Sequence, residues 1–212
     1  DTFTINKDLV MKLCKMMIDE KLNLKWTCNS RVDTIDEDML RIMRKAGCWM
    51  IAYGFESGSQ KILDLCKKNT TVEQGKKIVE LTDKVGIKIY GYFIIGLIGE
   101  TKETIQETIN FAKNLPITFA IFHVASPYPG TEFYHQVKDN DWLTSEQWED
   151  TNQGGSSPIN YPQLSSQEIM TGIQKAYRSF YLRPIAIWKI LRSIRNFSDL
   201  KQFIMAGINQ LF

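Results

Sequence analysis

One junction in the sequence places a carboxylate between an apolar run and a glycine-rich turn. Residues 49–55 are apolar and aromatic, Glu56 follows them, and Ser57 and Gly58 lead into a helical turn. A carboxylate in this position can accept hydrogen bonds from a ligand amine or a ribose hydroxyl. Backbone N–H groups at the start of a helical turn can bind an anion. The alternative is that Glu56 caps the next helix and the glycines only satisfy turn geometry.

Two further junctions carry polar or glycine residues after a strand-like run. The stretch "CNSRVD" supplies Asn29 and Arg31, and "GLIGET" supplies Gly96 and Gly99. Glycines let the backbone approach a ligand closely. Because ligands bind at the carboxyl ends of strands in parallel βα arrays, we expect the three junctions to meet at one rim.

Strand-like and helix-like segments alternate along the first 125 residues. Strand-like alternation or β-rich composition covers 22–30, 49–55, 87–96 and 117–125, and helical spacing covers 5–21, 34–47, 71–86 and 101–116. Strands separated by helices of this length need crossover connections, so the sheet is predicted to be parallel. Helix starts are predicted at Asn6, at a Thr34/Glu37 capping box, at Thr70 or Thr71, and at a Ser165/Glu168 capping box.

The residues on the two faces of the strands favour one parallel fold. In the run 49–56, large apolar residues alternate with a row that ends in Gly54 and Glu56, and the run 22–31 has a similar polar row with Asn29 and Arg31. A polar inner row favours a barrel with a partly open lumen, whereas an open doubly wound sheet has strands that are apolar on both faces. We therefore predict an α/β fold: a partial TIM-like (βα) barrel over residues 1–134, followed by a loop and helical extension over 135–212.

Composition excludes several classes of protein. The 212 residues carry a net charge of +2, which gives no bulk attraction to nucleic acid, and no apolar run is long enough to span a membrane. The cysteines lack the close pairing of a metal knuckle, so we predict reduced thiols in a cytoplasmic protein and no metal site. Because the sequence opens with Asp1 inside a loop, we expect a fragment that lacks its N-terminal part.

Several aromatic and histidine residues leave two interpretations open. His123, within an apolar strand, is more typical of a buried core residue than of a ligand, and His135 is expected on the surface. Tyr128, in the turn "PYPGT", could cover a substrate or only shape the turn. The aromatic residues of the following loop could form a lid or anchor the loop; they are Trp142, Trp148 and Tyr161.

The C-terminal tail has an amphipathic pattern with a basic side. The apolar stripe consists of Ile187, Trp188, Leu191 and Ile194. The basic residues largely to one side of it are Lys189, Arg192 and Arg195. Packing against the rest of the protein is one interpretation. The alternative is a peripheral membrane contact, which a lipid-like substrate would suit, because basic amphipathic helices with tryptophan favour interfaces.

Three ordered stretches carry a family resemblance: residues 26–71, from "WTCNSRVD" through "YGFESGSQ" to "KKNTT"; residues 91–112, "GYFIIGLIGETKETIQETINFA"; and "PYPGTEF". Together they resemble the second half of a radical AdoMet enzyme core, most closely the class with a cobalamin-binding domain upstream. The resemblance covers residues 1–134. It implies S-adenosyl-L-methionine as cofactor, with a 4Fe-4S cluster and cobalamin held by an N-terminal part that this chain lacks. No Cys-x-x-x-Cys-x-x-Cys loop is present, so the chain alone is not expected to generate a radical.

The resemblance also implies site residues. Glu56 and Lys68 match the acidic and basic groups that contact the AdoMet amino acid moiety, and Tyr92 falls where some relatives place a ribose-contacting carboxylate. The "GLIGET" stretch stands where the family often has Gly-x-Pro-x-Glu, and its backbone would line the adenine pocket. No catalytic residue is assigned. The predicted contacts are Asn29, Arg31, Glu56, Ser57, Lys68, Tyr92 and Gly96 for the cofactor and Tyr128 for the substrate.

The implied activity is radical-based methyl transfer, or modification of a C–H bond, on a small organic or lipid-like molecule. A methylthiotransferase-like enzyme acting on tRNA or protein is one alternative, although its C-terminal β-barrel contrasts with the helical tail predicted here. A non-catalytic barrel remnant that binds a nucleotide or a partner is the other. No nucleic-acid partner is expected from the favoured interpretation.

Overall fold

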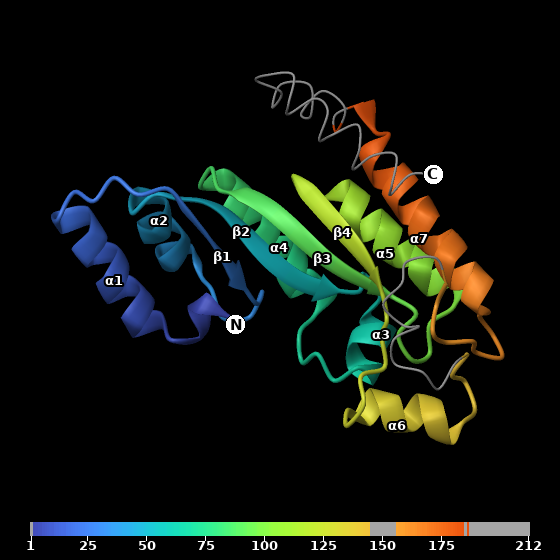
Figure 1. The fold of residues 1–212 in the computed structure, drawn as a ribbon. Helices are drawn as coiled ribbons and strands as arrows, with labels where there is room; N and C mark the ends of the chain where they lie inside the picture. Colours follow the sequence, from blue (N-terminus) through green and yellow to red (C-terminus); the bar gives the residue numbers. More distant parts are fainter. Residues whose placement is uncertain (1, 145–155, 185, 187–212) are drawn as a thin grey trace. The chain divides into compact units, whose positions relative to one another are not determined.

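The computed structural model describes residues 2–144, 156–184 and 186, and it shows an α/β chain (Figure 1). Strands and helices alternate as the sequence predicts. Their order is η1 (Phe3–Ile5), α1 (Lys7–Asp19), β1 (Trp26–Ser30), α2 (Glu37–Lys45), β2 (Cys48–Glu56), α3 (Gln60–Leu65), α4 (Val72–Lys84), β3 (Lys88–Ile95), α5 (Lys102–Asn114), β4 (Phe119–Val124), α6 (Glu132–Asp139) and α7 (Ser166–Tyr181).

The described strands form one four-stranded sheet in the order β1-β2-β3-β4. The β1–β2 and β2–β3 pairs are parallel, with Asn29 opposite Ala52 and Gly54 opposite Tyr92. Successive strands are therefore joined by crossover connections that contain helices, as parallel pairing requires. The predicted α/β class with parallel strands is confirmed.

The chain packs as two compact units. One contains residues 2–93 and 110–121, and the other contains residues 94–109 and the described residues from 122 onward. Strands β3 and β4 each begin in the first unit and end in the second. The predicted boundary at residue 134, between barrel and extension, stays a prediction.

The first unit buries one row of β2 beneath its helices. The Tyr53 hydroxyl hydrogen-bonds the Thr82 hydroxyl of α4 at 2.9 Å. The Phe55 ring stacks on Phe93 at 5.4 Å between centroids and meets Phe111 edge-on at 5.5 Å. Such aromatic contacts add to the free energy gained from burial. The opposite row of β2, which ends in Glu56, is therefore the one turned away from the helical core.

Helix starts in the first unit agree with the predictions except at α2. Asn6 caps α1 by accepting from Leu9 N, and Thr71 forms a capping box at α4. The predicted Thr34/Glu37 box is wrong, because the Asp36 carboxylate accepts from Met39 N and the helix begins two residues later than predicted. Asp and Thr are both favoured N-cap residues. The Thr34 hydroxyl instead contacts Thr4 and the carbonyl of Arg31, and Asp36 caps the helix.

The first strand is shorter than predicted, and the segment before it is more exposed than its alternating pattern indicates. The strand begins at Trp26, because Lys21 and Asn23 adopt left-handed conformations with φ of 52° and 51° and make a turn after α1. Leu22 and Leu24 stay about half exposed, at 51% and 50%. Alternating hydrophobicity alone does not distinguish such an extended turn from a strand.

The second unit is organised around α7. The Ser165/Glu168 capping box that begins this helix is confirmed. The Tyr177 hydroxyl accepts a hydrogen bond from Phe122 N at 3.2 Å, which joins α7 to the end of β4. His123 is exposed, so its predicted core position is wrong: the strand turns the neighbouring Phe122 inward instead.

Of the remaining predictions, one is confirmed and two concern residues outside the described ranges. His135 is exposed, as expected. Trp148 and the amphipathic tail from residue 187 lie outside the described residues. None of the helices within the described ranges combines the length and apolar character that a bilayer crossing requires.

Candidate functional site

Glu56 ends β2 in a conformation that non-glycine residues rarely adopt. Its φ is 63°, and Ser57 N donates to Phe55 O at 2.8 Å across it, which closes a three-residue γ-turn. The register with β3 shifts between Gly54 and Glu56, as at a β-bulge. Left-handed backbone at a bulged strand end costs energy and recurs where a side chain must be aimed at a ligand. The carboxylate is thus held at the strand end by the backbone itself.

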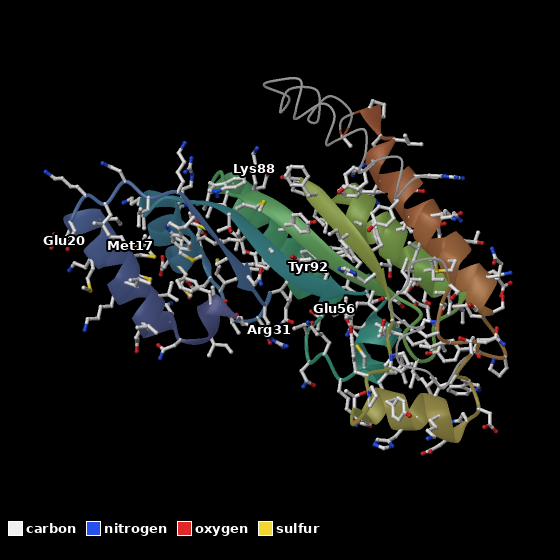
Figure 2. The ribbon with its side chains drawn as sticks, viewed as in Figure 1. Met17, Glu20, Arg31, Glu56, Lys88 and Tyr92 are labelled. Carbon is white, nitrogen blue, oxygen red and sulfur yellow. The ribbon has the colours of Figure 1, made fainter. Side chains whose placement is uncertain are left out.

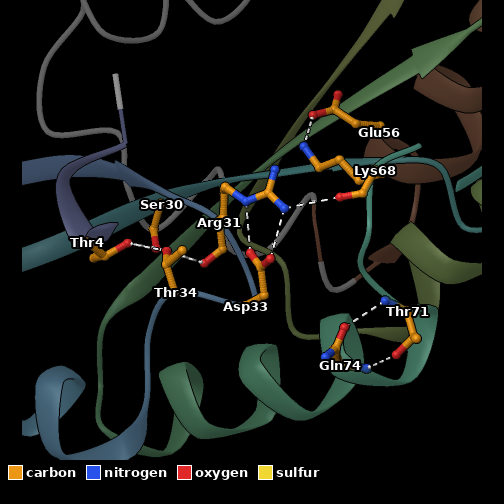
Figure 3. A network of polar contacts seen from close by, with 9 residues as sticks. All are labelled: Thr4, Ser30, Arg31, Asp33, Thr34, Glu56, Lys68, Thr71 and Gln74. Carbon is orange, nitrogen blue, oxygen red and sulfur yellow. Dashed lines mark hydrogen bonds and ion pairs between the residues drawn. The ribbon is translucent and has the colours of Figure 1, made fainter. Parts of the chain in front are cut away.

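The aimed carboxylate pairs with a lysine twelve residues later. Lys68 Nζ lies 2.5 Å from Glu56 Oε1, and the two side chains are only 15% and 21% exposed (Figure 3). Lys68 also presents its carbonyl to Arg31 Nη2 at 3.0 Å. Three residues predicted from separate parts of the sequence therefore come together, Arg31 from the end of β1, Glu56 from the end of β2 and Lys68 from the loop after α3.

Arg31 is held by a partner that the sequence analysis did not single out. Its Nε and Nη2 donate to the two Asp33 carboxylate oxygens at 2.9 and 2.8 Å. This bidentate bond raises the pKa of the Arg31 guanidinium and lowers the pKa of the Asp33 carboxyl. The Arg-x-Asp spacing directly after a strand was the available signal. Asp33 orients Arg31 toward Lys68.

A chain of hydroxyl groups supports the backbone beneath Arg31. Thr4 Oγ1 lies 2.6 Å from Ser30 Oγ and 2.7 Å from Thr34 Oγ1, and the Ser30 and Thr34 hydroxyls lie 2.9 and 3.3 Å from Arg31 O (Figure 3). Thr4 and Ser30 are 1% and 4% exposed. Buried hydroxyls that satisfy one another rigidify their segment. No local pattern predicted this group, since its members are up to 30 residues apart.

Two other predicted cofactor contacts, Tyr92 and Asn29, lie on strands next to β2. Figure 2 shows Arg31 and Glu56 at the same end of the sheet, with Tyr92 on the neighbouring strand. Tyr92 pairs with Gly54 and stacks at a tilt on Tyr90, 5.1 Å between centroids. Asn29 is exposed, opposite Ala52. It lies two residues before Arg31, which follows directly after the end of β1.

Ser57 has a turn-forming role in this structure. It is 1% exposed, its N–H closes the turn at Glu56, and its hydroxyl accepts from Ser59 N at 3.1 Å. Its backbone donor is thus engaged within the protein. The role of Ser57 as a cofactor contact stays a prediction.

The Glu56–Lys68 pair has the charge pattern of an α-amino acid. A zwitterionic ligand can exchange with the pair, its ammonium group bonding Glu56 and its carboxylate bonding Lys68, so that no charge is left unpaired. Because both side chains are mostly buried, leaving either one alone would be costly. A ligand that carries only one of the two charges would leave one protein group without a partner.

Gly54 leaves the space that this ion pair occupies. A methyl group on Gly54 would lie 2.7 Å from Glu56 Oε1 and 3.4 Å from Lys68 Nζ. We expect Gly54→Ala to displace the two flexible side-chain ends and to weaken AdoMet binding about tenfold, with a thermal unfolding midpoint near that of the wild type. Calorimetric titration with AdoMet measures the first effect and differential scanning calorimetry the second. Wild-type affinity in the variant would show that the pair does not hold the ligand.

Gly96, in the second unit, belongs to a separate buried loop. Its φ is 98°, its N–H and that of Leu97 both donate to Glu100 Oε2, and its carbonyl accepts from the Tyr161 hydroxyl at 2.9 Å. Tyr161 is 2% exposed and meets Trp142 edge-on. The tyrosine therefore anchors the loop. The position of Gly96 in an adenine pocket stays a prediction.

Glu100 is the most buried carboxylate of this loop and was not singled out in sequence. It is 0% exposed, and its Oε1 has no hydrogen-bond partner among the described residues. Burial raises its pKa to about 7, against the opposing effect of the two N–H donors. Glu100 matches the last position of the Gly-x-Pro-x-Glu pattern that "GLIGET" resembles, and that signal did not indicate burial.

Tyr128 forms part of the predicted turn. Thr131 N donates to Tyr128 O at 3.1 Å, and Thr131 then caps α6. The Tyr128 side chain is 51% exposed. Its contact with a substrate stays a prediction.

The cysteines do not gather into a cluster-binding set. All four are free thiols, and no group of three or more His, Cys, Asp or Glu in the described part of the chain has the geometry to hold a metal ion. Burial raises the pKa of Cys14 to about 11, and a hydrogen bond with Cys28 together with burial raises that of Cys48. The four thiols are therefore not gathered into the set of cysteine ligands that an iron–sulfur cluster needs.

The chain is similar in sequence to known proteins. The model of the Radical SAM superfamily matches residues 1–112. An uncharacterized methyltransferase of Pyrococcus horikoshii is 36% identical over 89% of this chain, which spans 41% of that protein. The anaerobic magnesium-protoporphyrin IX monomethyl ester cyclase of Cereibacter sphaeroides is 31% identical over 99% of this chain, which spans 35% of that protein.

The solved structures show the same fold. The radical S-adenosylmethionine methyltransferase TsrM of Kitasatospora setae, solved with cobalamin and a 4Fe-4S cluster bound, superposes with a TM-score of 0.56 at 17% identity. The match covers 72% of this chain and 31% of TsrM. With a family model that covers more than half of its residues, the chain belongs to the radical SAM superfamily.

Proposed function

We propose that this chain supplies the AdoMet-binding strands of a radical AdoMet enzyme that methylates a small organic molecule. The observation that carries the proposal is the Glu56–Lys68 ion pair, mostly buried and aimed by a left-handed turn at the carboxyl end of β2. In a parallel βα array this is the end at which ligands bind. Arg31 adds a cation beside the pair, and its own charge is balanced by Asp33.

The site complements the functional groups of AdoMet. Glu56 and Lys68 match the ammonium and carboxylate of its methionyl part, and Tyr92 offers a phenol on the next strand for a ribose hydroxyl. Carboxylate, cation and approachable backbone converging at one strand end are the usual components of such a site. A nucleotide-binding remnant would have no need for a paired carboxylate and lysine, so the pair favours AdoMet over a simple nucleotide.

The electron source is proposed to lie outside these residues. A 4Fe-4S cluster, when bound, supplies the electron that cleaves AdoMet, but Cys14, Cys28, Cys48 and Cys66 do not form its site. The Glu56–Lys68 site is proposed to bind and orient AdoMet. Cobalamin is proposed on the likeness to TsrM, whose structure contains it.

Methyl transfer is preferred to other outcomes because one of the similar proteins is named a methyltransferase. The cyclase of Cereibacter sphaeroides favours a second candidate, radical modification of a C–H bond on a porphyrin-like molecule. We infer a cytoplasmic location, which the free thiols support, because reducing compartments keep thiols unpaired.

Product analysis tests the proposal. The protein encoded by the longest reading frame that contains these residues is purified without oxygen, reconstituted with iron, sulfide and cobalamin, and incubated with AdoMet and dithionite. We expect S-adenosylhomocysteine, the product of methyl transfer, together with 5′-deoxyadenosine. 5′-Deoxyadenosine alone would select the C–H modification instead. Unchanged AdoMet after reconstitution would contradict both candidates.

A further inference from the structure

A cavity of about 570 Å³ lies in the first unit at the amino-terminal ends of β1 and β2. Its wall is formed by the C-terminal turn of α1, the segment that leads into β1, the end of α2 and the first residues of β2. Trp49 in the wall and Glu56 are seven residues apart on one strand, which is about 23 Å at the usual rise per residue. The cavity is therefore separate from the Glu56–Lys68 site.

The wall is strongly basic. Lys21, Lys25, Arg44 and Lys45 line the cavity, and no Asp or Glu does. None of these four cations forms an ion pair with another residue in the described ranges. Figure 2 labels Met17 and Glu20 at this end of α1, but only Met17 belongs to the wall.

The partial negative charges at the two helix ends balance only part of this positive charge. The C-termini of α1 and α2 each carry a partial negative charge of about half an elementary unit, which one cation in total would balance. Four cations around one concave surface leave a positive potential concentrated there. Such a surface attracts an anion with more than one negative charge.

Backbone contacts fix the shape of this wall. Leu22 N donates to Met17 O at 3.1 Å, and Trp26 joins the β1 start to the end of α2 through Nε1, which donates to Ala46 O at 2.9 Å. Gly47 passes so close to this segment that a methyl group on it would lie 1.8 Å from Leu24 O. The cavity is thus preformed, which lowers the entropic cost of binding a ligand.

An apolar and aromatic side accompanies the cations. Trp49 is 38% exposed and carries Lys88 Nζ at 5.8 Å from its ring centroid, and Leu24 is 50% exposed. We propose that the cavity binds an organic phosphate, with the phosphate among the four cations and the apolar or aromatic part of the molecule against Trp49. A phosphate carries the charge that the cations attract, and the exposed tryptophan ring offers stacking area.

Two probes distinguish the sources of such a phosphate. Adenosine monophosphate represents a soluble nucleotide and is titrated into the protein by calorimetry. Vesicles of phosphatidylglycerol, compared with vesicles of phosphatidylcholine, represent a lipid headgroup and are tested by co-flotation. Binding of either anionic probe, with no binding to phosphatidylcholine, is the expected result.

A matched pair of variants locates the binding. Arg44→Gln with Lys45→Gln removes two charges from the wall, and Lys12→Gln with Lys15→Gln removes two exposed charges of α1 that are not in the wall. We expect the first pair to weaken binding of the responsive probe at least about tenfold and the second to change it less than about twofold. Circular dichroism confirms that both variants fold.

Two outcomes would overturn the proposal. One is the absence of binding for both anionic probes at low salt. The other is equal weakening in the two double variants, which would indicate diffuse attraction to a basic protein and no defined site. Because Arg44 and Lys45 line this cavity and are not part of the Glu56–Lys68 site, the comparison of the two double variants is independent of AdoMet turnover.

Discussion

Glu56→Ala is expected to weaken AdoMet binding about 100-fold in the full-length protein, which corresponds to ~3 kcal/mol. The variant removes the group that would bond the AdoMet ammonium, and it leaves Lys68, which is 15% exposed, without its partner at 2.5 Å. Truncating one member of a mostly buried charged pair costs more free energy than an exposed ion pair contributes. Calorimetric titration of AdoMet into the reconstituted protein measures the change.

Two control variants separate binding from folding. Glu56→Gln combined with Lys68→Gln keeps a hydrogen-bonded pair of similar size without charges, so we expect a thermal unfolding midpoint near that of the wild type and the same loss of AdoMet affinity. Lys7→Gln breaks the exposed Lys7–Asp36 pair in the same unit and should leave binding unchanged. Unchanged affinity in Glu56→Ala would assign Glu56 to the turn alone.

The second large effect concerns the pH dependence of stability at Glu100. Its pKa is about 7 in the folded protein and about 4.5 in the unfolded chain. Because the folded state holds the proton more tightly, the contribution of Glu100 to the free energy of unfolding is fully present below pH 4.5. It is lost as the pH rises through about 7. The difference amounts to ~3 kcal/mol.

Glu100→Gln should remove this dependence. Gln cannot ionise, so we expect the free energy of unfolding of the variant to gain ~3 kcal/mol relative to the wild type between pH 5 and pH 8, measured by urea denaturation at each pH. Glu107→Gln, on the exposed side of α5, serves as the control and should parallel the wild type. Parallel curves for Glu100→Gln would mean that the buried carboxyl is already ionised at pH 5.

Much of the fold follows from local patterns in the sequence. The alternation of strands and helices, the parallel sheet, and the caps at Asn6, Thr71 and Ser165 were all predicted, because each depends on residues within one or two turns of chain. The cap at α2 and the exposure of His123 were predicted wrongly. Their positions depend on contacts with distant segments, which local spacing does not encode.

The candidate site shows the same division. Glu56 stood out in the sequence because a carboxylate followed an apolar strand and preceded a glycine-rich turn. Lys68, Arg31, Tyr92 and Asn29 were singled out only through the family resemblance or their place at a strand end. Asp33 was missed although its spacing from Arg31 was a local signal. The Thr4–Ser30–Thr34 hydroxyl chain was missed because Thr4 is 26 and 30 residues away from its two partners.

The sequence by itself determined which residues end the strands and therefore which side chains are available for chemistry. The tertiary structure alone decided that Glu56 pairs with Lys68 and that the turn at Glu56 is left-handed. It also decided that Glu100 is buried with one oxygen that has no partner in the part of the chain that the structure describes. The physical reason is that strand and helix preferences act over a few residues, whereas ion pairing and desolvation depend on which segments the folded chain brings together.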